Sequence, residues 1–148
     1  MTKLAGVAQL LRELFASQGL AVIATQGSGQ PYGNLVAFAE TDDLKQLLFV
    51  TNRHTRKYEN IEADGRIAVL VDSRTNRPAD FQNAVAVTAT GIAGDVPGSE
   101  KERLAKIYLN KHPQLVAFIN EPDNALVSVN VADYVIAKFS EVNTVHVG

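Results

Sequence analysis

The amino-acid sequence predicts a mainly β (α+β) fold, in which six antiparallel strands close into a barrel flanked by helices. Three observations predict it. Short runs rich in β-branched residues are separated by turn residues, so hairpins dominate the order of elements. Strands and helices do not alternate regularly, which argues against a doubly wound parallel sheet. Six strands of this length avoid open edges best by closing into a barrel.

The first part of the chain predicts one helix and three strands. Apolar residues recur at three- and four-residue steps from Leu4 to Phe15, Thr2 can cap this helix, and Gly19 ends it. Polar and glycine-containing turns then separate short β-rich runs. The strands are expected at residues 20–25, 31–39 and 46–51.

The second part predicts three helices and three strands. The helices are expected at 54–63, from Ser99 to 111 with Ser99 and Glu102 as a capping box, and at 112–120. Residues 73–83 are polar and are expected to form a loop. The strands are expected at 66–72, at 84–96 with a bend at Gly91 or Gly94, and at 126–139 with a bend at Asp133-Tyr134. No linker divides the chain, so residues 1–148 are predicted to form a single domain.

Composition excludes several classes of function. The formal net charge of −2 argues against nucleic acid as the main partner. The chain has no cysteine, which excludes disulfides, Cys-ligated zinc and a thiol nucleophile. No apolar stretch approaches the ~20 residues that span a bilayer, so no membrane association is expected. A cytoplasmic location is the expectation that fits these properties.

The most informative segment is Leu47-Leu48-Phe49-Val50-Thr51-Asn52-Arg53-His54-Thr55-Arg56-Lys57-Tyr58-Glu59-Asn60-Ile61. It is an apolar strand followed by a polar turn and a helix, with Thr55 as the expected N-cap. Arg56 and Lys57 then lie in the first helical turn, where cations oppose the helix dipole. Two explanations are open. Either an anion binds both side chains and the free backbone N–H groups, or both side chains extend into water.

This segment resembles the flavin-binding segment of the pyridoxamine 5′-phosphate oxidase-like family of FMN-binding split β-barrels. The shared features are Thr-Asn after a strand, Thr-Arg-Lys after two more residues, and Asn-Ile in the helix. The following run, Ala63 to Val71, is similar to the next strand of that family. The order of elements over residues 1–139 also resembles the family, so the similarity covers nearly the whole chain and implies a six-stranded antiparallel split β-barrel.

The resemblance implies a cofactor, an assembly and a set of binding residues. In that family FMN lies at the interface of a homodimer, and an oxidoreductase of this type passes electrons between a small-molecule donor or substrate and the flavin. The threonine after the third strand and the Arg-Lys pair bind the phosphate, and the backbone of the second strand lies along the flavin ring. The implied cofactor-binding residues are Asn34, Leu35, Val36, Ala37, Val50, Thr51, Thr55, Arg56 and Lys57. The catalytic residues stay unknown at this point, and no metal site is expected.

The sequence departs from the true oxidases of that family at the substrate-binding positions. Their second-strand motif opens with arginine and closes with lysine, where this chain has Asn34 and Ala39. The glutamine of their fifth strand has no counterpart in Val85–Thr88. The chain contains no tryptophan, so the C-terminal grip on pyridoxal phosphate is missing. Oxidation of pyridoxamine phosphate is therefore not expected.

Two other functions remain open from the sequence. One is a reductase that uses a deazaflavin, and the other is a non-catalytic module that binds flavin or haem. Three histidines are scattered without metal-ligand spacing, which predicts surface or loop positions, although His146 is of interest because some relatives of this fold bind haem. Tyr32 and Tyr134 are the tyrosines expected to reach a ring or an interface.

Overall fold

The structure of the protein is a computed structural model that describes residues 3–148, with side chains from residue 6 onward. The predicted cap Thr2 lies outside the described residues. The strands are β1 (Leu20–Gly27), β2 (Gln30–Glu40), β3 (Gln46–Asn52), β4 (Arg66–Asp72), β5 (Ala86–Asp95), β6 (Asn124–Lys138) and β7 (Glu141–His146). The helices are α1 (Lys3–Ser17), α2 (Arg56–Ala63), α3 (Asp80–Asn83), α4 (Gly98–Lys111), the 3-10 helix η1 (Pro113–Leu115) and α5 (Val116–Ile119).

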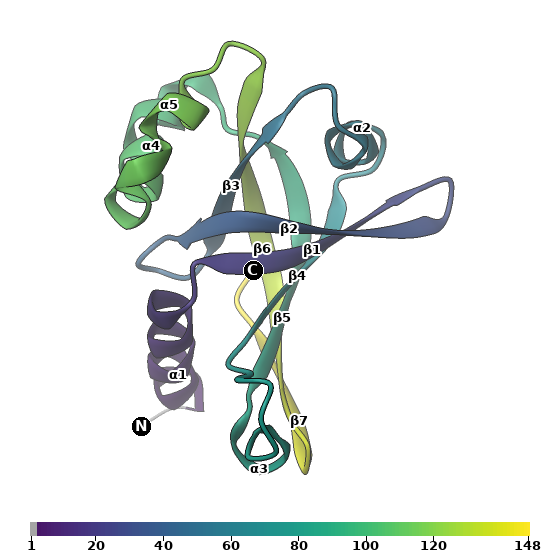
Figure 1. Cartoon of the computed structure of the whole chain (residues 1–148), viewed down its shortest axis with the longest axis vertical. Helices are drawn as coiled ribbons and strands as arrows, with labels where there is room; N and C mark the ends of the chain where they lie inside the picture. Colours follow the sequence, from purple (N-terminus) through teal and green to yellow (C-terminus); the bar gives the residue numbers. More distant parts are fainter. Residues whose placement is uncertain (1–2) are drawn as a thin grey trace.

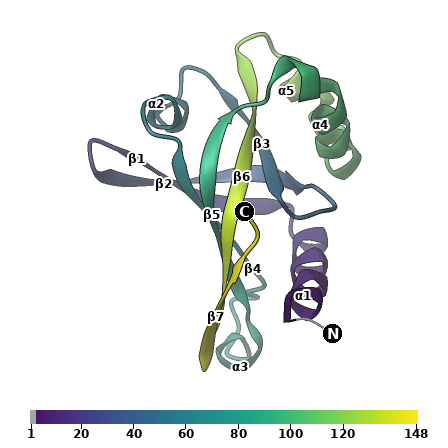
Figure 2. The ribbon, with the colours of Figure 1, turned by 180° about the vertical axis from the view of Figure 1, so that it is seen from behind.

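The strands form one antiparallel sheet that closes on itself (Figures 1 and 2). Their order is β3-β2-β1-β4-β5-β6-β7, and pairing of β3 with β6 closes the first six strands into a barrel. The long strand β6 makes this closure possible. Its first half pairs with β3 from Asn124 to Asn130, and its second half pairs with β7 from Asp133 to Lys138. The predicted six-stranded antiparallel barrel is confirmed.

The core fills the barrel and extends to the two helices at its ends. Alternate strand residues face inward, as the period of two requires. Inward side chains on four neighbouring strands are Val36, Ile23, Val69 and Val87. Helix α1 adds Leu11, Leu14 and Phe15, and α2 adds Tyr58 and Ile61. A second apolar cluster lies outside β2 and β3, beneath α4, and includes Ala39, Leu48, Val50, Leu104 and Tyr108.

A β-bulge bends the pair of longest strands at the predicted place. The register between β5 and β6 shifts between Thr90 and Gly91, so that Ala132 is left without a partner on β5. A Cβ atom on Gly91 would lie 2.1 Å from the carbonyl oxygen of Asn130, which only glycine avoids. The predicted bend at Gly91 is confirmed, whereas the bend in β6 lies at Ala132, next to the predicted Asp133.

Local details differ from the sequence prediction at three places. The tail after Ser140 forms the seventh strand, β7, because its backbone completes the free edge of β6. The predicted loop 73–83 contains the short helix α3. The capping box at Ser99 is wrong: α4 begins at Gly98 after Pro97, and no side chain caps it.

Candidate functional site

The barrel is split between β2 and β3. These strands pair only from Phe38 to Glu40 on β2, opposite Leu47 to Phe49 on β3. Beyond that point β2 continues to pair with β1, and β3 continues to pair with β6, but the two strands have no mutual partner. Backbone groups of β2 therefore face an open edge. The N-terminus of α2 lies at the end of β3, beside this edge (Figure 1).

The backbone of Leu35 and Ala37 faces the open edge. The N–H of Phe38 donates to the carbonyl of Gly19 in the direction of β1, at 3.1 Å. Since backbone groups alternate along a strand, Leu35 and Ala37 point the other way. The Tyr108 hydroxyl donates to the Ala37 carbonyl at 3.1 Å, which agrees with that direction. The backbone groups of Leu35 and the N–H of Ala37 thus face the split, while the Ala37 carbonyl already accepts from Tyr108.

Two threonines organise the turn between β3 and α2. Thr55 has an extended backbone and caps α2, because its Oγ1 accepts from the N–H of Tyr58. The same hydroxyl donates to the carbonyl of Asn52 at 2.8 Å and lies 3.1 Å from Oγ1 of Thr51. Thr51 is only 1% exposed. The buried Thr51 hydroxyl thus contacts the capping hydroxyl of Thr55 and helps to fix its position. The predicted N-cap role of Thr55 is confirmed.

Arg56 and Lys57 occupy the first turn of α2. The Arg56 guanidinium lies over the ring of Tyr32, 4.5 Å from its centroid, in a cation–π contact across the split. None of the ion pairs in the described part of the chain involves Arg56 or Lys57. The helix N-terminus thus carries two cations that form no ion pair with a described carboxylate, although Glu59 lies in the same turn.

The predicted cofactor-binding residues of β2 and β3 lie along the split, and their side chains point in different directions. Leu35 is 62% exposed on the outer face, and Val36 faces the core. The side chain of Val50 is buried beneath α4, so only its backbone can border a ligand. Asn34 points inward, and its Oδ1 is the one buried side-chain oxygen or nitrogen without a hydrogen-bond partner among the described residues. A ligand donor at the split would satisfy this atom.

A polar network behind the site was missed by the sequence interpretation. The Tyr58 hydroxyl donates to Oδ1 of Asp95 at 2.8 Å, and Arg53 donates to Oδ2 of Asp95 at 3.4 Å and to the carbonyl of Asn124 at 3.1 Å. On the other side of α2, the buried Asn60 amide donates to Oγ1 of Thr25 at 3.0 Å. These contacts fix α2 against β1, β5 and β6. Only the three-dimensional fold brings these residues together, so no local pattern could have revealed them.

The three histidines and Tyr134 each contact a residue of a neighbouring segment. His112 lies in the connection between α4 and η1, as the expected loop position requires, but it is buried there, with its Nε2 2.7 Å from the Phe38 carbonyl, rather than on the surface. His54 and His146 are exposed and lie beside Asp123 and Asp133. Tyr134 is fully buried and donates to the Leu44 carbonyl at 2.7 Å, and burial raises the pKa of its hydroxyl. It therefore cannot reach an interface.

The described residues also contain no cluster of three or more His, Cys, Asp or Glu side chains arranged to hold a metal ion. Within residues 3–148, no helix has the length and apolar character needed to cross a membrane.

Comparison with known proteins identifies the family. The family model for pyridoxamine 5′-phosphate oxidase matches residues 7–134. The chain belongs to the pyridoxamine 5′-phosphate oxidase family. The matched range runs from α1 into β6 and includes the split, the threonine turn and α2. A comparison with curated proteins gave no match.

Solved structures share the fold of this family member at low sequence identity. A heme binding protein from Mycobacterium smegmatis has a TM-score of 0.83 and 16% identity, over 94% of this chain and 57% of its own. A FAD-binding protein from Mesorhizobium loti has a TM-score of 0.69 and 16% identity, over 87% and 90% of the two chains. A protein from Clostridium acetobutylicum, related to general stress protein 26, has a TM-score of 0.70 and 18% identity over 96% and 95%. The chain thus spans little more than half of the mycobacterial protein.

Proposed function

We propose that this member of the pyridoxamine 5′-phosphate oxidase family is an FMN-dependent oxidoreductase. The observation that carries the proposal is the pair of cations, Arg56 and Lys57, at the N-terminus of α2 beside the open split of the barrel. Backbone N–H groups and cations at a helix start bind a phosphate. The FAD bound by the structural neighbour from Mesorhizobium loti adds support for a flavin.

The residues around the split fit FMN. Arg56 and Lys57 would hold its phosphate, while Thr51 and Thr55 keep the helix start in place. Backbone groups of Leu35 and Ala37 would accept or donate hydrogen bonds along the ring, and the unpartnered Oδ1 of Asn34 would accept one from the ligand. An apolar wall and a few placed polar groups are the usual composition of a cofactor site.

FMN when bound would supply hydride and single-electron transfer to and from a small-molecule donor or substrate. The chain itself would bind and orient the ring and exclude water. No side chain at the split has the burial and charged neighbours of a general acid or base, which is consistent with a protein whose redox chemistry belongs to its cofactor.

We further propose that the protein is a homodimer. Its outer sheet face carries a continuous row of side chains across five paired strands, namely Leu35, Val22, Leu70, Thr88 and Val135. None of these is buried within the chain, and Leu20 beside them is 55% exposed. Apolar patches of this kind mark interfaces, and an obligate dimer buries upwards of about 2,000 Å². On β6 only outward residues such as Val135 are available to the interface, because the inward residues of this strand fill the core.

The visible spectrum of the purified protein tests the cofactor. Flavin absorption, with a released cofactor whose mass is that of FMN, is the expected result. Bleaching by a reduced nicotinamide under anaerobic conditions, followed by reoxidation with repeated turnover, supports an oxidoreductase. A bound flavin that no donor reduces would contradict the enzymatic part, and a haem spectrum or a deazaflavin mass would contradict FMN.

A further inference from the structure

The hairpin of β1 and β2 packs against α2 and is joined to it at two points. In the middle of α2, the buried Asn60 amide donates to Oγ1 of Thr25, and a Cβ atom on Gly27 would lie 2.5 Å from Oδ1 of Asn60. At the end of α2, the Gln26 amide donates to Oδ2 of the C-cap residue Asp64. The hairpin and the helix are therefore held in a fixed relative position, side by side in both views (Figures 1 and 2).

Tyr32 lies on the face of the hairpin that contacts α2. It is paired with Thr25 across the two strands, and opposite residues of an antiparallel pair point to the same side of the sheet. The Arg56 guanidinium lies over its ring, 4.5 Å from the centroid. Two residues further along the same face is Asn34, whose Oδ1 has no hydrogen-bond partner. The Tyr32 ring thus borders the split and contacts the start of α2.

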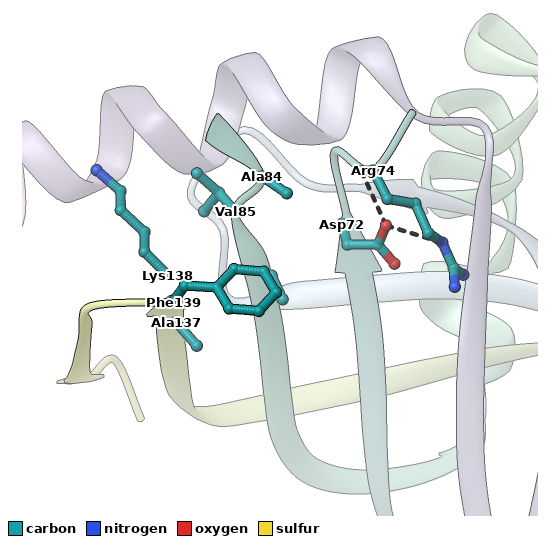
Figure 3. A pocket seen from close by; sticks show the side chains of 8 residues that line it. Asp72, Arg74, Ala84, Val85, Ala137, Lys138 and Phe139 are labelled. Atoms are coloured by element: carbon teal, nitrogen blue, oxygen red, sulfur yellow. Dashed lines mark hydrogen bonds and ion pairs between the residues drawn. The ribbon is translucent and has the colours of Figure 1, made fainter. Parts of the chain in front are cut away.

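Arg56 differs from the arginines that pair with acidic side chains. Nε of Arg74, for example, lies 3.0 Å from Oδ1 of Asp72 (Figure 3). Such a carboxylate offsets the charge of a guanidinium and occupies its N–H groups, whereas an aromatic face attracts the cation and does neither. Arg56 on the Tyr32 ring therefore keeps its charge and its donors for an external anion. The arginines of the described chain that form such ion pairs are Arg53, Arg66, Arg74 and Arg103.

The first turn of α2 leaves backbone donors beside this guanidinium. The N–H groups of Tyr58 and Glu59 donate to the side chain and the carbonyl of Thr55. Those of Arg56 and Lys57 have no hydrogen-bond partner among the described residues, as expected at a helix start. An anion at this end of α2 would therefore meet free N–H groups and a guanidinium whose position the hairpin fixes.

We propose that Tyr32 is a positioning residue of the phosphate site, whose ring holds the Arg56 guanidinium in place both before and after a phosphate binds. The inference rests on the proposed function, in which Arg56 and Lys57 bind the phosphate of FMN. An arginine that rotates freely loses conformational entropy when it binds a ligand. Because the Tyr32 ring already restricts Arg56, the ring should strengthen phosphate binding about threefold to tenfold.

Replacement of the aromatic ring tests this role. Tyr32→Leu keeps an apolar side chain without the ring face, so FMN affinity should fall about threefold to tenfold in isothermal titration. Tyr32→Phe keeps the ring and should bind FMN like the parent protein, because the Tyr32 hydroxyl has no hydrogen-bond partner among the described residues. Riboflavin, which lacks the phosphate, should bind the parent and both variants equally.

The dependence on Arg56 separates positioning from a general structural role. In protein that already carries Arg56→Ala, Tyr32→Leu should cause no further loss of FMN affinity. An equal loss for riboflavin, or a loss that persists without Arg56, would show that Tyr32 acts on the fold or on the flavin ring. Either result would overturn the proposal, as would unchanged FMN affinity in Tyr32→Leu.

Inorganic phosphate separates this inference from the choice of cofactor. In NMR spectra of the ¹⁵N-labelled full chain, the Arg56 Hε signal should lie upfield because of the Tyr32 ring, and it should stay upfield when added phosphate shifts it. A protein that behaves in this way but does not bind FMN would refute the proposed cofactor and retain the role of Tyr32. Loss of the upfield position on binding would mean that phosphate draws Arg56 off the ring, which would overturn the role of Tyr32 even where FMN binds. Absence of both phosphate and FMN binding would overturn both proposals.

Discussion

The hydroxyl of Tyr58 donates to Oδ1 of Asp95 at 2.8 Å, and this contact ties α2 to the end of β5. Burial, followed by this hydrogen bond and the charge of Asp95, raises the pKa of the Tyr58 hydroxyl, so it stays a donor at neutral pH. Arg53 stabilises the same carboxylate from the other side and lies over the Tyr58 ring. The helix start that carries Arg56 and Lys57 is therefore anchored from behind.

Tyr58→Phe tests this anchoring. The ring remains in the core while the hydrogen bond is lost, so the free energy of unfolding should fall by about 1 kcal/mol. If FMN binds as proposed, its affinity should weaken severalfold because the proposed phosphate-binding turn is less fixed, whereas affinity for riboflavin should change little. Urea unfolding and fluorescence titration measure the two effects. An equal loss for FMN and riboflavin would mean that Tyr58 does not act on the phosphate-binding turn.

The barrel and the start of α2 could be predicted from local sequence. The long-range contacts that hold α2, and the seventh strand, could not. Alternation around Ile23 and Val69 and the turn residues between strands specify hairpins, and Thr55 before Arg56 specifies a capped helix. The contact of Asp95 with Tyr58 depends on strand register, which places residues 37 positions apart in contact. Strand β7 was missed because the edge of β6 that it completes exists only in the folded barrel.

The ion pair between Asp64 and Arg66 should make the stability of the fold depend on pH in the acidic range. Side-chain and backbone hydrogen bonds from Arg66 hold the pKa of the Asp64 carboxyl below its ordinary value of 3.8. A carboxyl with a lowered folded-state pKa stabilises the fold above its unfolded pKa and loses this effect as the pH falls. Stability should therefore decrease below about pH 4, and Asp64→Asn should flatten that part of the profile. Urea unfolding from pH 5 to pH 3 measures it. A profile unchanged by the substitution would contradict the assignment.

Substrate specificity should differ from that of the true oxidases. Asn34 and Ala39 replace the arginine and lysine expected at the ends of their second-strand motif, and neither can pair with a substrate phosphate. Ala39 is moreover buried in the cluster beneath α4. We expect no useful turnover of pyridoxamine phosphate in an oxygen-consumption assay with added FMN. Robust oxidation would show that other residues bind the substrate.

The proposed dimer can be tested on its outer face. Leu20→Glu places a charge among apolar side chains that a second subunit would cover, so it should shift the protein from dimer to monomer. Because Leu20 is exposed within the chain, the barrel should stay folded. Val116→Glu on the helix α5 is a similarly exposed control that is not part of this sheet face and should remain dimeric. Analytical ultracentrifugation at micromolar concentration measures the outcome, and a monomeric parent protein would refute the dimer.

The double substitution Arg56→Ala/Lys57→Ala tests the phosphate site directly. Charged hydrogen bonds contribute about 1.5–3 kcal/mol each, so loss of both should weaken FMN binding by roughly 3–6 kcal/mol, on the order of a hundredfold to ten-thousandfold. The fold should remain intact, because cations at a helix start oppose the helix dipole and neither side chain forms an ion pair with a described residue.

Riboflavin is the matched ligand control for this variant, since it has the ring but not the phosphate. It should bind the parent protein more weakly than FMN and should bind parent and variant almost equally. Isothermal titration with both ligands, together with circular dichroism of the variant, separates the possible results. Unchanged FMN affinity would place the phosphate elsewhere. An unfolded variant would show that the cations at the helix start stabilise the barrel, and Tyr32→Leu, which removes the ring and keeps both cations, would then distinguish the cation–π contact from phosphate binding.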